Sequence, residues 1–507
     1  MRIPVFLIIS LMLIVNSCNQ SPPARSIDLK ELTVEDIHAA YRASTYTCEQ
    51  LVLAYLNRMD SVNPAINAIT YRNAEALAQA RALDQEFKET GKLRPLHGIP
   101  MIVKDNYETA GLPTTAGSKA LVNFIPQANA WMVQALIDAG AIVLAKSNMA
   151  EWAFSPMHTE SSTFGITHNP YDTTRVPAGS SGGTAAAIAA NLGVLGLGTD
   201  TGNSIRGPSS HCALVGIRPS LGLISRQGIV PLYLRNDVGG PMCRTVTDAV
   251  RVIQATAGSD PGDPLTYFGE GYVKADYLSY LRKDGLQGKR IGVLRFMTKA
   301  IDPGIEELFE QAIRDLRASG AEVLDSIDIP DFEILRQNQW CAEFRPDVEA
   351  YLAERVRIDS VQTIEDILRI GTKSDYTRRR LEYQRSHLDR PEGDIPCGSP
   401  FDDPLRLAFR KAIEQVMDDQ LIDALIYPTW NYPPAHINRF EEEYRGDNSQ
   451  VIAPHTGQPA ITVPMGFNPD GLPAGIQFLG RLFDEPTLIE IAYGYEQVTK
   501  HRLDLKQ

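Results

Sequence analysis

Two turns rich in glycine and serine carry the residues with the clearest chemical potential in this chain. The first reads Gly-Ser-Ser-Gly-Gly over 179–183, and the second reads Gly-Thr-Asp-Thr-Gly-Asn-Ser-Ile-Arg over 198–206. Such turns bring serine hydroxyls close to free backbone N–H groups, which acyl transfer needs as a nucleophile and as donors to an oxyanion. One such turn would say little, but the pair predicts an active site.

The segment between the two turns predicts that they meet in space. Residues 184–191 are dominated by alanine and predict a helix, whereas residues 193–199 are apolar and predict a buried strand. A helix followed by a strand returns the chain to where it began, so we expect Ser180 and Ser204 to lie side by side. The N–H groups from Thr201 onward would then point at one oxyanion.

A serine hydroxyl is a poor nucleophile without a base. None of the nine histidines lies in a sequence context typical of a catalytic triad. Lysine is the better candidate, because burial at the end of a strand can leave a lysine neutral near pH 7. Residues 98–103 lead into Lys104 and residues 141–145 lead into Lys146, and periodicity alone does not choose between the two lysines.

Five motifs, taken together and in this order, resemble the amidase signature family, which includes fatty acid amide hydrolase and bacterial peptide amidase. They read GIPMIVKD at 98–105, GSSGG at 179–183, GTDTGNSIR at 198–206, HTGQPAITVPMG at 455–466 and GLPAGIQFLG at 471–480. The resemblance implies one compact α/β domain and an amidase that hydrolyses a linear amide. It also implies a Ser-Ser-Lys triad formed by Lys104, Ser180 and Ser204.

The resemblance further implies how these residues share the reaction. Lys104 would take the proton of Ser180 while Ser180 takes that of Ser204, and Ser204 would attack the amide carbonyl to form an acyl-enzyme. The oxyanion would be held by the N–H groups of Thr201, Gly202, Asn203 and Ser204. In relatives the bridging serine follows a cis peptide bond, and the family mechanism uses no cofactor and no metal.

One position departs from the family pattern. Many relatives have two glycines before the nucleophile, whereas this chain has Gly202 and Asn203. Asparagine tolerates left-handed φ better than other non-glycine residues, so the turn is expected to survive. The added side chain is expected to narrow the site or to hydrogen-bond the substrate.

Other polar residues near the two turns have structural interpretations. Ser181 directly precedes the alanine-rich segment and is interpreted as the N-cap of that helix. Asp200 and Arg206 flank the second turn and are interpreted as a buried ion pair that fixes the loop. Lys146 is interpreted as structural too.

The first turn also offers an alternative nucleophile. Residues 179–183 fit the G-x-S-x-G elbow of α/β-hydrolases, with Ser181 as the nucleophile. An elbow follows a buried strand, but residues 168–177 are polar and contain two prolines. The preceding segment therefore argues against an α/β-hydrolase esterase.

The N-terminal residues resemble a bacterial lipoprotein signal. The apolar run at 5–15 is too short to span a bilayer comfortably and has the length of a signal peptide. It is followed by Asn-Ser-Cys, which resembles a lipobox with Cys18 as the lipidated residue. The predicted organisation is a signal peptide at 1–17, a tether at 18–28 and an amidase domain at 29–507. The protein is thus expected to be an exported membrane lipoprotein facing the periplasm or the cell exterior, with an ordinary secretory signal as the alternative.

Composition agrees with an enzyme on a lipid tether. The chain has 49 basic and 62 acidic residues and a formal net charge of −13, which argues against nucleic acid as a partner. The six cysteines are widely spaced and suggest neither a metal site nor a disulfide framework. The expected partner is a small-molecule or peptide amide substrate, with membrane contact only through the lipid anchor.

The elements along the chain alternate between helix and strand. Helix starts are predicted at Thr33 and Thr47, helices at 75–86, 131–139, 304–318 and from Pro486, and strands at 141–145, 291–294 and 424–427. This alternation predicts the α/β class, with a central mixed β-sheet covered by helices on both faces.

Two segments lie outside the five motifs. Residues 340–395 are charged and contain Arg378, Arg379 and Arg380, and residues 430–432 read Trp-Asn-Tyr. They either shape the substrate entrance or form a solvated helical insert.

Two further functions stay open on the sequence. A cytoplasmic glutamyl-tRNA amidotransferase A-type subunit shares the motifs, but the export signal and the acidic composition count against it. A non-catalytic solute-binding lipoprotein would share the size and the anchor, but it needs no paired serine turns.

Overall fold

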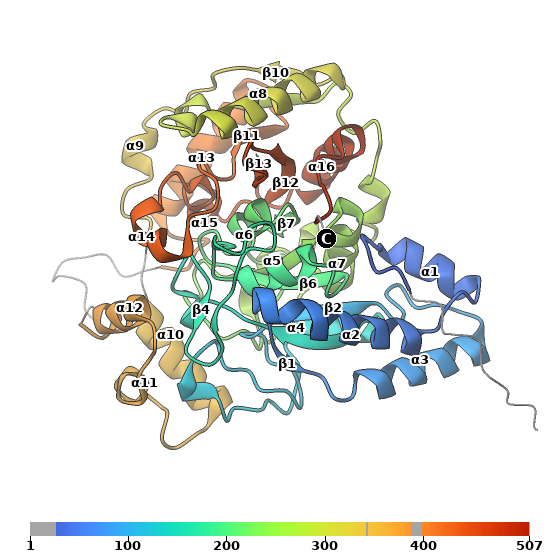
Figure 1. Ribbon diagram of the computed structural model, residues 1–507. Coiled ribbons are helices and arrows are strands. Elements are labelled where there is room, and N and C mark those ends of the chain that lie inside the picture. Colours follow the sequence, from blue (N-terminus) through green and yellow to red (C-terminus); the bar gives the residue numbers. More distant parts are fainter. Residues whose placement is uncertain (1–26, 341–342, 387–397, 506–507) are drawn as a thin grey trace, which may run out of the picture.

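An eleven-stranded mixed sheet forms the centre of the molecule (Figure 1). The computed structural model describes residues 27–340, 343–386 and 398–505. The strand order across the sheet is β1-β3-β2-β6-β8-β7-β12-β13-β11-β9-β10. The strands of this sheet are β1 (Ile69–Arg72), β2 (Pro100–Lys104), β3 (Ile142–Ser147), β6 (Leu195–Asp200), β7 (Val215–Arg218), β8 (Val238–Cys243), β9 (Arg290–Val293), β10 (Glu322–Leu324), β11 (Ala424–Pro428), β12 (Ala460–Phe467) and β13 (Pro473–Leu479).

Helices surround this sheet, and a separate two-stranded pair joins β4 (Glu160–Ser161) to β5 (Gly165–Ile166). The helices are α1 (Val34–Arg42), α2 (Cys48–Ile66), α3 (Ala76–Thr90), α4 (Trp131–Asp138), α5 (Gly182–Ala189), α6 (Arg206–His211), α7 (Val246–Thr256), α8 (Pro303–Ala318), α9 (Phe332–Leu335), α10 (Phe344–Tyr351), α11 (Ile364–Ile370), α12 (Asp375–Ser386), α13 (Pro404–Asp419), α14 (Phe440–Glu443), α15 (Ala453–Thr456) and α16 (Glu485–Thr499).

Different helices cover the two faces of the sheet, as two adjacent glycines of β8 show, because side chains of neighbouring strand residues point to opposite faces. A Cβ atom at Gly239 would meet the sulfur of Met132 in α4, whereas one at Gly240 would meet Ile205, directly before α6. Helix α4 packs on α7 and α7 packs on α16, while α5 and α6 contact each other on the opposite face. The predicted α/β fold with helices on both faces is therefore confirmed.

The helix ends follow the signals predicted from the sequence. Thr33 and Thr47 each accept a hydrogen bond from the third residue of their helix, which completes a capping box at the start of α1 and of α2. Gly91 ends α3 with a φ of 65°, in the left-handed region that glycine adopts without steric cost.

The charged segment predicted at 340–395 is packed against the rest of the protein. Helices α10, α11 and α12 group together at one edge of the molecule (Figure 1). Phe344 and Val348 of α10 belong to a second hydrophobic cluster with Trp152 and Phe154. The ring centroids of Phe154 and Phe344 lie 4.6 Å apart. The described part of this segment therefore packs against the body of the enzyme, which contradicts the interpretation as a solvated insert.

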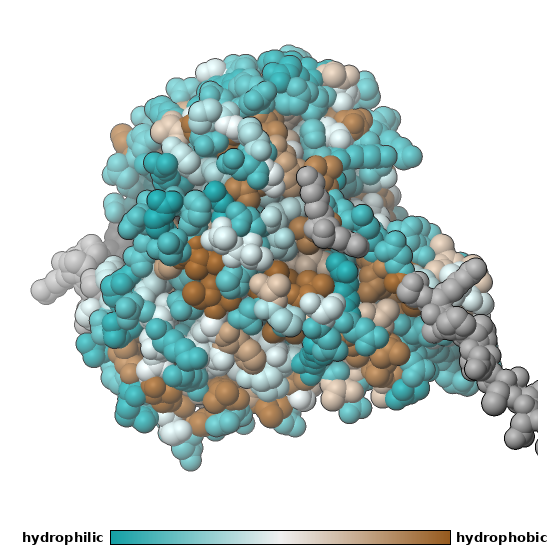
Figure 2. All heavy atoms as spheres, in the orientation of Figure 1, coloured by the Kyte–Doolittle hydropathy of each residue, from teal (hydrophilic) through white to brown (hydrophobic). Residues whose placement is uncertain are grey.

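Several sequence predictions concern residues outside this description. The signal peptide at 1–17, Cys18 and most of the tether lie there, as do Cys341 and Cys397. The cysteines at 48, 212 and 243 are buried and form no disulfide with one another. Within the described ranges no helix is long and apolar enough to cross a membrane. Hydrophilic residues dominate the face shown in Figure 2, interrupted by smaller apolar patches.

Candidate active site

Lys104 lies at the carboxyl end of β2, between β3 and β6. Both neighbouring strands run parallel to β2. The Lys104 side chain is fully buried, and its Nζ lies 2.7 Å from Oγ of Ser180 and 2.7 Å from Oγ1 of Thr199. Burial lowers the pKa of Lys104 to about 7, although the negative charges of Asp237 and Asp200 oppose that shift. This lysine can therefore be neutral near pH 7 and accept a proton.

Lys146 lies on the neighbouring strand β3 and makes different contacts. Its Nζ donates to the carbonyl oxygen of Tyr107 at 2.7 Å and to Oγ1 of Thr114 at 2.9 Å, and it lies 3.5 Å from a carboxylate oxygen of Asp105. Burial lowers the pKa of Lys146 to about 8. The structure thus places Lys104 against Ser180 and uses Lys146 to hold the loop that follows β2.

The two serine-rich turns are joined at the carbonyl oxygen of Pro156. That oxygen accepts hydrogen bonds from the backbone N–H of Gly179 at 3.0 Å and from Nδ2 of Asn203 at 3.2 Å. The peptide bond between Gly179 and Ser180 is cis. No hydrogen bond joins the described side chains of Ser180 and Ser204, and Oγ of Ser204 lies 3.4 Å from Oδ1 of Asn203 instead.

The structure corrects the expectation for Asn203. Its φ is not in the left-handed region, so the turn survives without that conformation. Its amide nitrogen is held by Pro156, as described above, while its oxygen accepts from the nucleophile candidate Ser204. The side chain lines the cavity at Ser204, and its polar atoms are engaged by the protein.

Ser181 lies at the predicted N-cap of α5, but its hydroxyl does not cap the helix. Its hydroxyl donates to the carbonyl oxygen of Thr199 at 3.2 Å and accepts from the Thr199 N–H at 3.3 Å. Because Thr199 lies on β6, the hydroxyl joins the turn before α5 to that strand. Ser181 is fully buried and does not line the cavity that contains Ser204.

Asp200 and Arg206 form the predicted buried ion pair. Nε of Arg206 lies 3.0 Å from Oδ2 of Asp200, and both side chains are fully buried. Sequence reasoning missed Arg218, whose Nη1 lies 2.9 Å from Oδ1 of Asp200. Burial raises the pKa of Asp200, but the two guanidinium charges outweigh burial and lower it to about 2. The carboxylate also accepts from the backbone N–H of Ile205 at 3.2 Å, so it holds the chain directly after Ser204.

We expect Asp200→Asn to lower the free energy of unfolding by about 3–5 kcal/mol, because it leaves two buried guanidinium groups without their counter-charge. Urea unfolding of the purified protein measures this change. The control is Asp375→Asn, since Asp375 pairs with Arg378 on the exposed surface of α12 and that loss should cost no more than about 1 kcal/mol. Equal effects of the two variants would contradict a role for Asp200 in fixing the turn.

A cavity of about 380 Å³ opens above Ser204. Thr201, Gly202, Asn203 and Ser204 line one side of it. Within the described part of the chain, the amide groups of Gly202, Asn203 and Ser204 donate to no protein acceptor. Of the three residues predicted to form the triad, only Ser204 lines the cavity, while Lys104 and Ser180 are fully buried. The arrangement can present a hydroxyl and free N–H donors to a bound carbonyl group.

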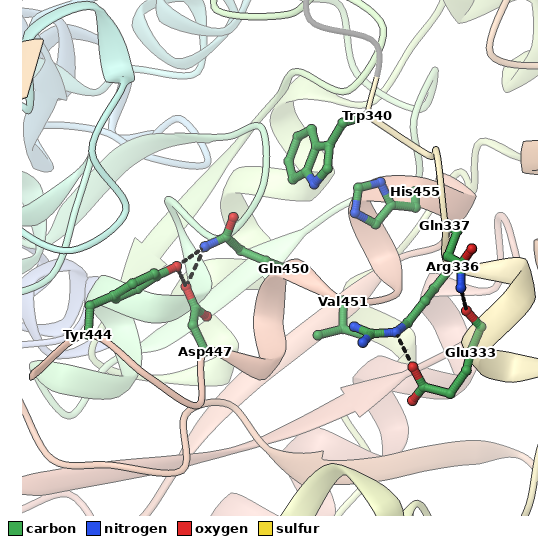
Figure 3. Close-up of a pocket in the computed structure, with 9 residues that line it drawn as sticks. All are labelled: Glu333, Arg336, Gln337, Trp340, Tyr444, Asp447, Gln450, Val451 and His455. Carbon is green, nitrogen blue, oxygen red and sulfur yellow. Dashed lines mark hydrogen bonds and ion pairs between the residues drawn. The ribbon is translucent and has the colours of Figure 1, made fainter. Parts of the chain in front are cut away.

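A second cavity of about 480 Å³ adjoins the first and shares Trp340, Tyr444 and Gln450 with it. In Figure 3 the indole of Trp340 lies between Gln450 and His455, and the rings of Trp340 and His455 meet edge to face with centroids 4.5 Å apart. The described part of the charged segment therefore lines the entrance. Residues 430–432 line neither cavity directly, but the ring of Trp430 packs against Tyr444, which lines both.

Sequence reasoning also missed two residues that support the site. Thr199 accepts hydrogen bonds from Lys104 and from Nδ2 of Asn106, the latter at 3.1 Å. Asp237 accepts from the hydroxyl of Thr201 at 2.5 Å and from the backbone N–H of Leu232 at 2.8 Å. Thr199 lies within the motif at 198–206, so its position in the sequence could have marked it as part of the site. Nothing in the sequence links Asp237 to Thr201, which lies 36 residues before it.

Comparisons with known proteins agree with one another. The family model described as Amidase matches residues 50–489. A probable amidase of Arabidopsis thaliana is 34% identical over 98% of this chain and 96% of its own. The A-type subunit of the glutamyl-tRNA(Gln) amidotransferase of Caldanaerobacter subterraneus is 34% identical over 94% of this chain and 98% of its own. The crystal structure of native peptide amidase from Stenotrophomonas maltophilia is 35% identical, with a TM-score of 0.80, and covers 94% of this chain and 98% of that one.

Proposed function

Because this chain belongs to the Amidase family of amide-hydrolysing enzymes, we propose that it cleaves a linear amide through an acyl-enzyme on Ser204. Lys104 is the base and Ser180 carries the proton between Ser204 and Lys104. The observation that carries this assignment is the 2.7 Å contact between Nζ of Lys104 and Oγ of Ser180. A buried lysine with a pKa of about 7 is a competent base near neutral pH.

Acylation begins with the Ser204 hydroxyl. In the proposed step that hydroxyl turns from Asn203 towards Ser180, which takes its proton while passing its own proton to Lys104. The Ser204 oxygen forms a bond to the amide carbon, and the carbonyl oxygen becomes an oxyanion. The proton then returns through Ser180 to the amine nitrogen, and the C–N bond breaks. A water molecule attacks the ester by the same route in reverse and releases the acid.

The oxyanion is stabilised by the N–H groups of the second turn. We assign this role to Thr201, Gly202, Asn203 and Ser204, of which the last three have amides that donate to no described protein acceptor. Preorganised donors of this kind are worth about 3–4 kcal/mol each in comparable sites. The contacts of Asp200 and Asp237 hold this turn in place before substrate binds.

A substrate screen tests the proposed activity. Purified protein is incubated with peptide amides, fatty amides and aryl amides, and release of ammonia or amine is measured. Peptide amides are the first class to test, because the peptide amidase of Stenotrophomonas maltophilia is similar over most of the chain. Absence of hydrolysis in all three classes would contradict an independent amidase.

One observation favours a second candidate function. The amidotransferase A-type subunit of Caldanaerobacter subterraneus matches almost its whole length to this chain. A protein of that kind would need partner subunits, so purified protein alone would then release little ammonia. Adding the partner proteins of the native host to the assay separates the two functions, since an independent amidase gains nothing from them.

We further propose that the protein is exported and held on a membrane by a lipid at Cys18. The support is the sequence alone, with its apolar run at 5–15 followed by Asn-Ser-Cys. Cys18 precedes the expected enzyme domain at 29–507, so the anchor would supply location and no chemistry.

In a bacterial host, we expect the wild-type protein to partition into the membrane fraction and to incorporate a palmitate analogue, because lipidation of Cys18 adds a membrane anchor. Cys18→Ala should not incorporate it, and Cys48→Ala is the matched control because Cys48 is buried. A chain beginning at Ser26 should keep full amidase activity. Labelling of Cys18→Ala at the wild-type level would contradict the lipoprotein assignment.

A further inference from the structure

The cavity above Ser204 is lined mainly by aromatic residues, and the charge in its lining is positive. Among the described residues that line it, Arg380 alone is charged, and no carboxylate lines it. The aromatic residues of its lining are Phe154, Tyr233, Trp340, Tyr376, Tyr383 and Tyr444. The chain has 62 acidic residues, yet none of those described lines this cavity.

Arg380 differs from the two arginines that precede it on α12. Arg378 pairs with Asp375 at 2.6 Å, and Arg379 pairs with Glu441 at 2.7 Å. Both pairs are exposed to solvent. Successive residues of a helix point about 100° apart, so the third arginine is directed away from those surface acids. Within the described chain, Arg380 forms no ion pair and lines the cavity instead.

The guanidinium group of Arg380 has spare hydrogen-bonding capacity. Its Nη2 lies 3.3 Å from the hydroxyl of Tyr233, and its carbon lies 5.4 Å from the ring centroid of Tyr383. Its Nε is buried and has no acceptor among the described residues, and Nη1 likewise has no hydrogen bond to any of them. Arginine stays charged at all ordinary pH values and binds carboxylates through two parallel N–H donors.

An acidic residue of the adjoining cavity is already engaged by other groups. Asp447 lines that cavity and accepts from Nε2 of Gln450 at 2.9 Å and from the hydroxyl of Tyr444 at 3.2 Å. Its other oxygen accepts from the hydroxyl of Ser449 at 2.5 Å. Asp447 therefore does not neutralise Arg380, and the counter-charge is left to a ligand.

We propose that Arg380 binds a carboxylate of the substrate, so that the enzyme prefers amides that carry a free carboxylate. The proposal rests on the proposed function, because it names the substrate class of the same cavity. Arg380 selects and orients this substrate, and the reacting atoms remain those at Ser204. The aromatic wall suits a substrate whose remaining surface is apolar.

Two matched series of amides test this proposal in the full enzyme. One series pairs the monoamides of succinic, glutaric and adipic acid with straight-chain amides of matching length, which places the carboxylate in the acyl part. The other pairs 4-acetamidobenzoate with acetanilide, which places it in the amine part. We expect a higher kcat/KM for the carboxylate member of at least one series. Arg380→Gln should reduce that kcat/KM by roughly 10- to 10²-fold, the value of one charge-assisted contact, and should reduce the kcat/KM of the neutral member far less, so that the preference is lost.

Arg379→Gln is the control, because Arg379 lies on the same helix and its partner Glu441 is exposed. Arg380→Lys should keep part of the preference for carboxylates, because lysine keeps the positive charge but lacks the two parallel N–H donors of the guanidinium group. Thermal unfolding of each variant shows that the fold is kept. A wild-type enzyme that hydrolyses neutral amides with no preference for carboxylates would overturn this proposal and leave the proposed amidase intact. Equal selectivity of Arg380→Gln and Arg379→Gln would also overturn it.

Discussion

Ser204→Ala is expected to reduce amide hydrolysis by on the order of 10³-fold or more, because it removes the atom that forms the acyl-enzyme. Ser204 is 4% exposed and lines the cavity, and its hydroxyl makes only the 3.4 Å contact with Asn203 among the described residues. Loss of one small hydroxyl with so few contacts should leave the fold unchanged. Steady-state hydrolysis of the best amide from the screen, together with thermal unfolding, measures both effects.

Ser181→Ala is the matched control for this substitution. Ser181 lies in the first turn and bonds to Thr199 on β6, so its loss should lower stability more than it lowers the chemical step. If Ser204→Ala were fully active and Ser181→Ala were folded but inactive, the nucleophile would be Ser181 in the first turn. That result would favour the α/β-hydrolase elbow.

Lys104→Ala is expected to lower kcat/KM by on the order of 10²-fold or more, the usual contribution of a general base. Its Nζ contacts Ser180 and Thr199, and no other described lysine contacts either serine of the proposed relay. Lys146→Met is the control, because Lys146 is equally buried on the neighbouring strand but bonds to the loop after β2. We expect it to lower stability and to reduce kcat/KM far less per folded molecule.

The pH dependence has a definite sign. Burial lowers the pKa of Lys104 from 10.5 to about 7, so the lysine is neutral above that value and protonated below it. Only the neutral amine accepts a proton, and kcat/KM should therefore fall as the pH drops through about 7 and stay level on the alkaline side. In Lys104→Ala the remaining kcat/KM should no longer fall as the pH drops through about 7. An unchanged fall in the variant would assign the titration to another group.

Much of the fold was predictable because local signals determine it. Capping threonines, helix-ending glycines and apolar runs each act over a few residues, so the starts of α1 and α2, the closing glycine of α3 and the presence of β6 follow from the sequence. The order of the sheet depends on pairing between distant strands. The adjacency of β2 and β6, which brings Lys104 to the serine turns, is one such long-range feature.

In the candidate site, too, residues within local motifs were predicted and residues that act through distant partners were not. The motifs and the family resemblance predicted Lys104, Ser180 and Ser204, and the structure adds their contacts. Arg218, Asp237 and Thr199 were missed because each acts through a partner on another element. The N-cap position of Ser181 was predicted, but the contact of its hydroxyl was not, because that hydroxyl bonds to a strand that is distant in sequence. The sequence alone therefore does not predict which side chains on different helices and strands contact one another.

The site of covalent attachment tests the central claim most directly. The enzyme is treated with a fluorophosphonate, which phosphonylates an activated serine, and the adduct is located by mass spectrometry. Trypsin releases residues 176–206 as one peptide that contains Ser180, Ser181 and Ser204, so fragment ions must place the added mass within it. The proposed mechanism predicts the adduct on Ser204, with labelling lost in Ser204→Ala and slowed in Lys104→Ala. An adduct on Ser180 or Ser181 in the wild-type enzyme would contradict it.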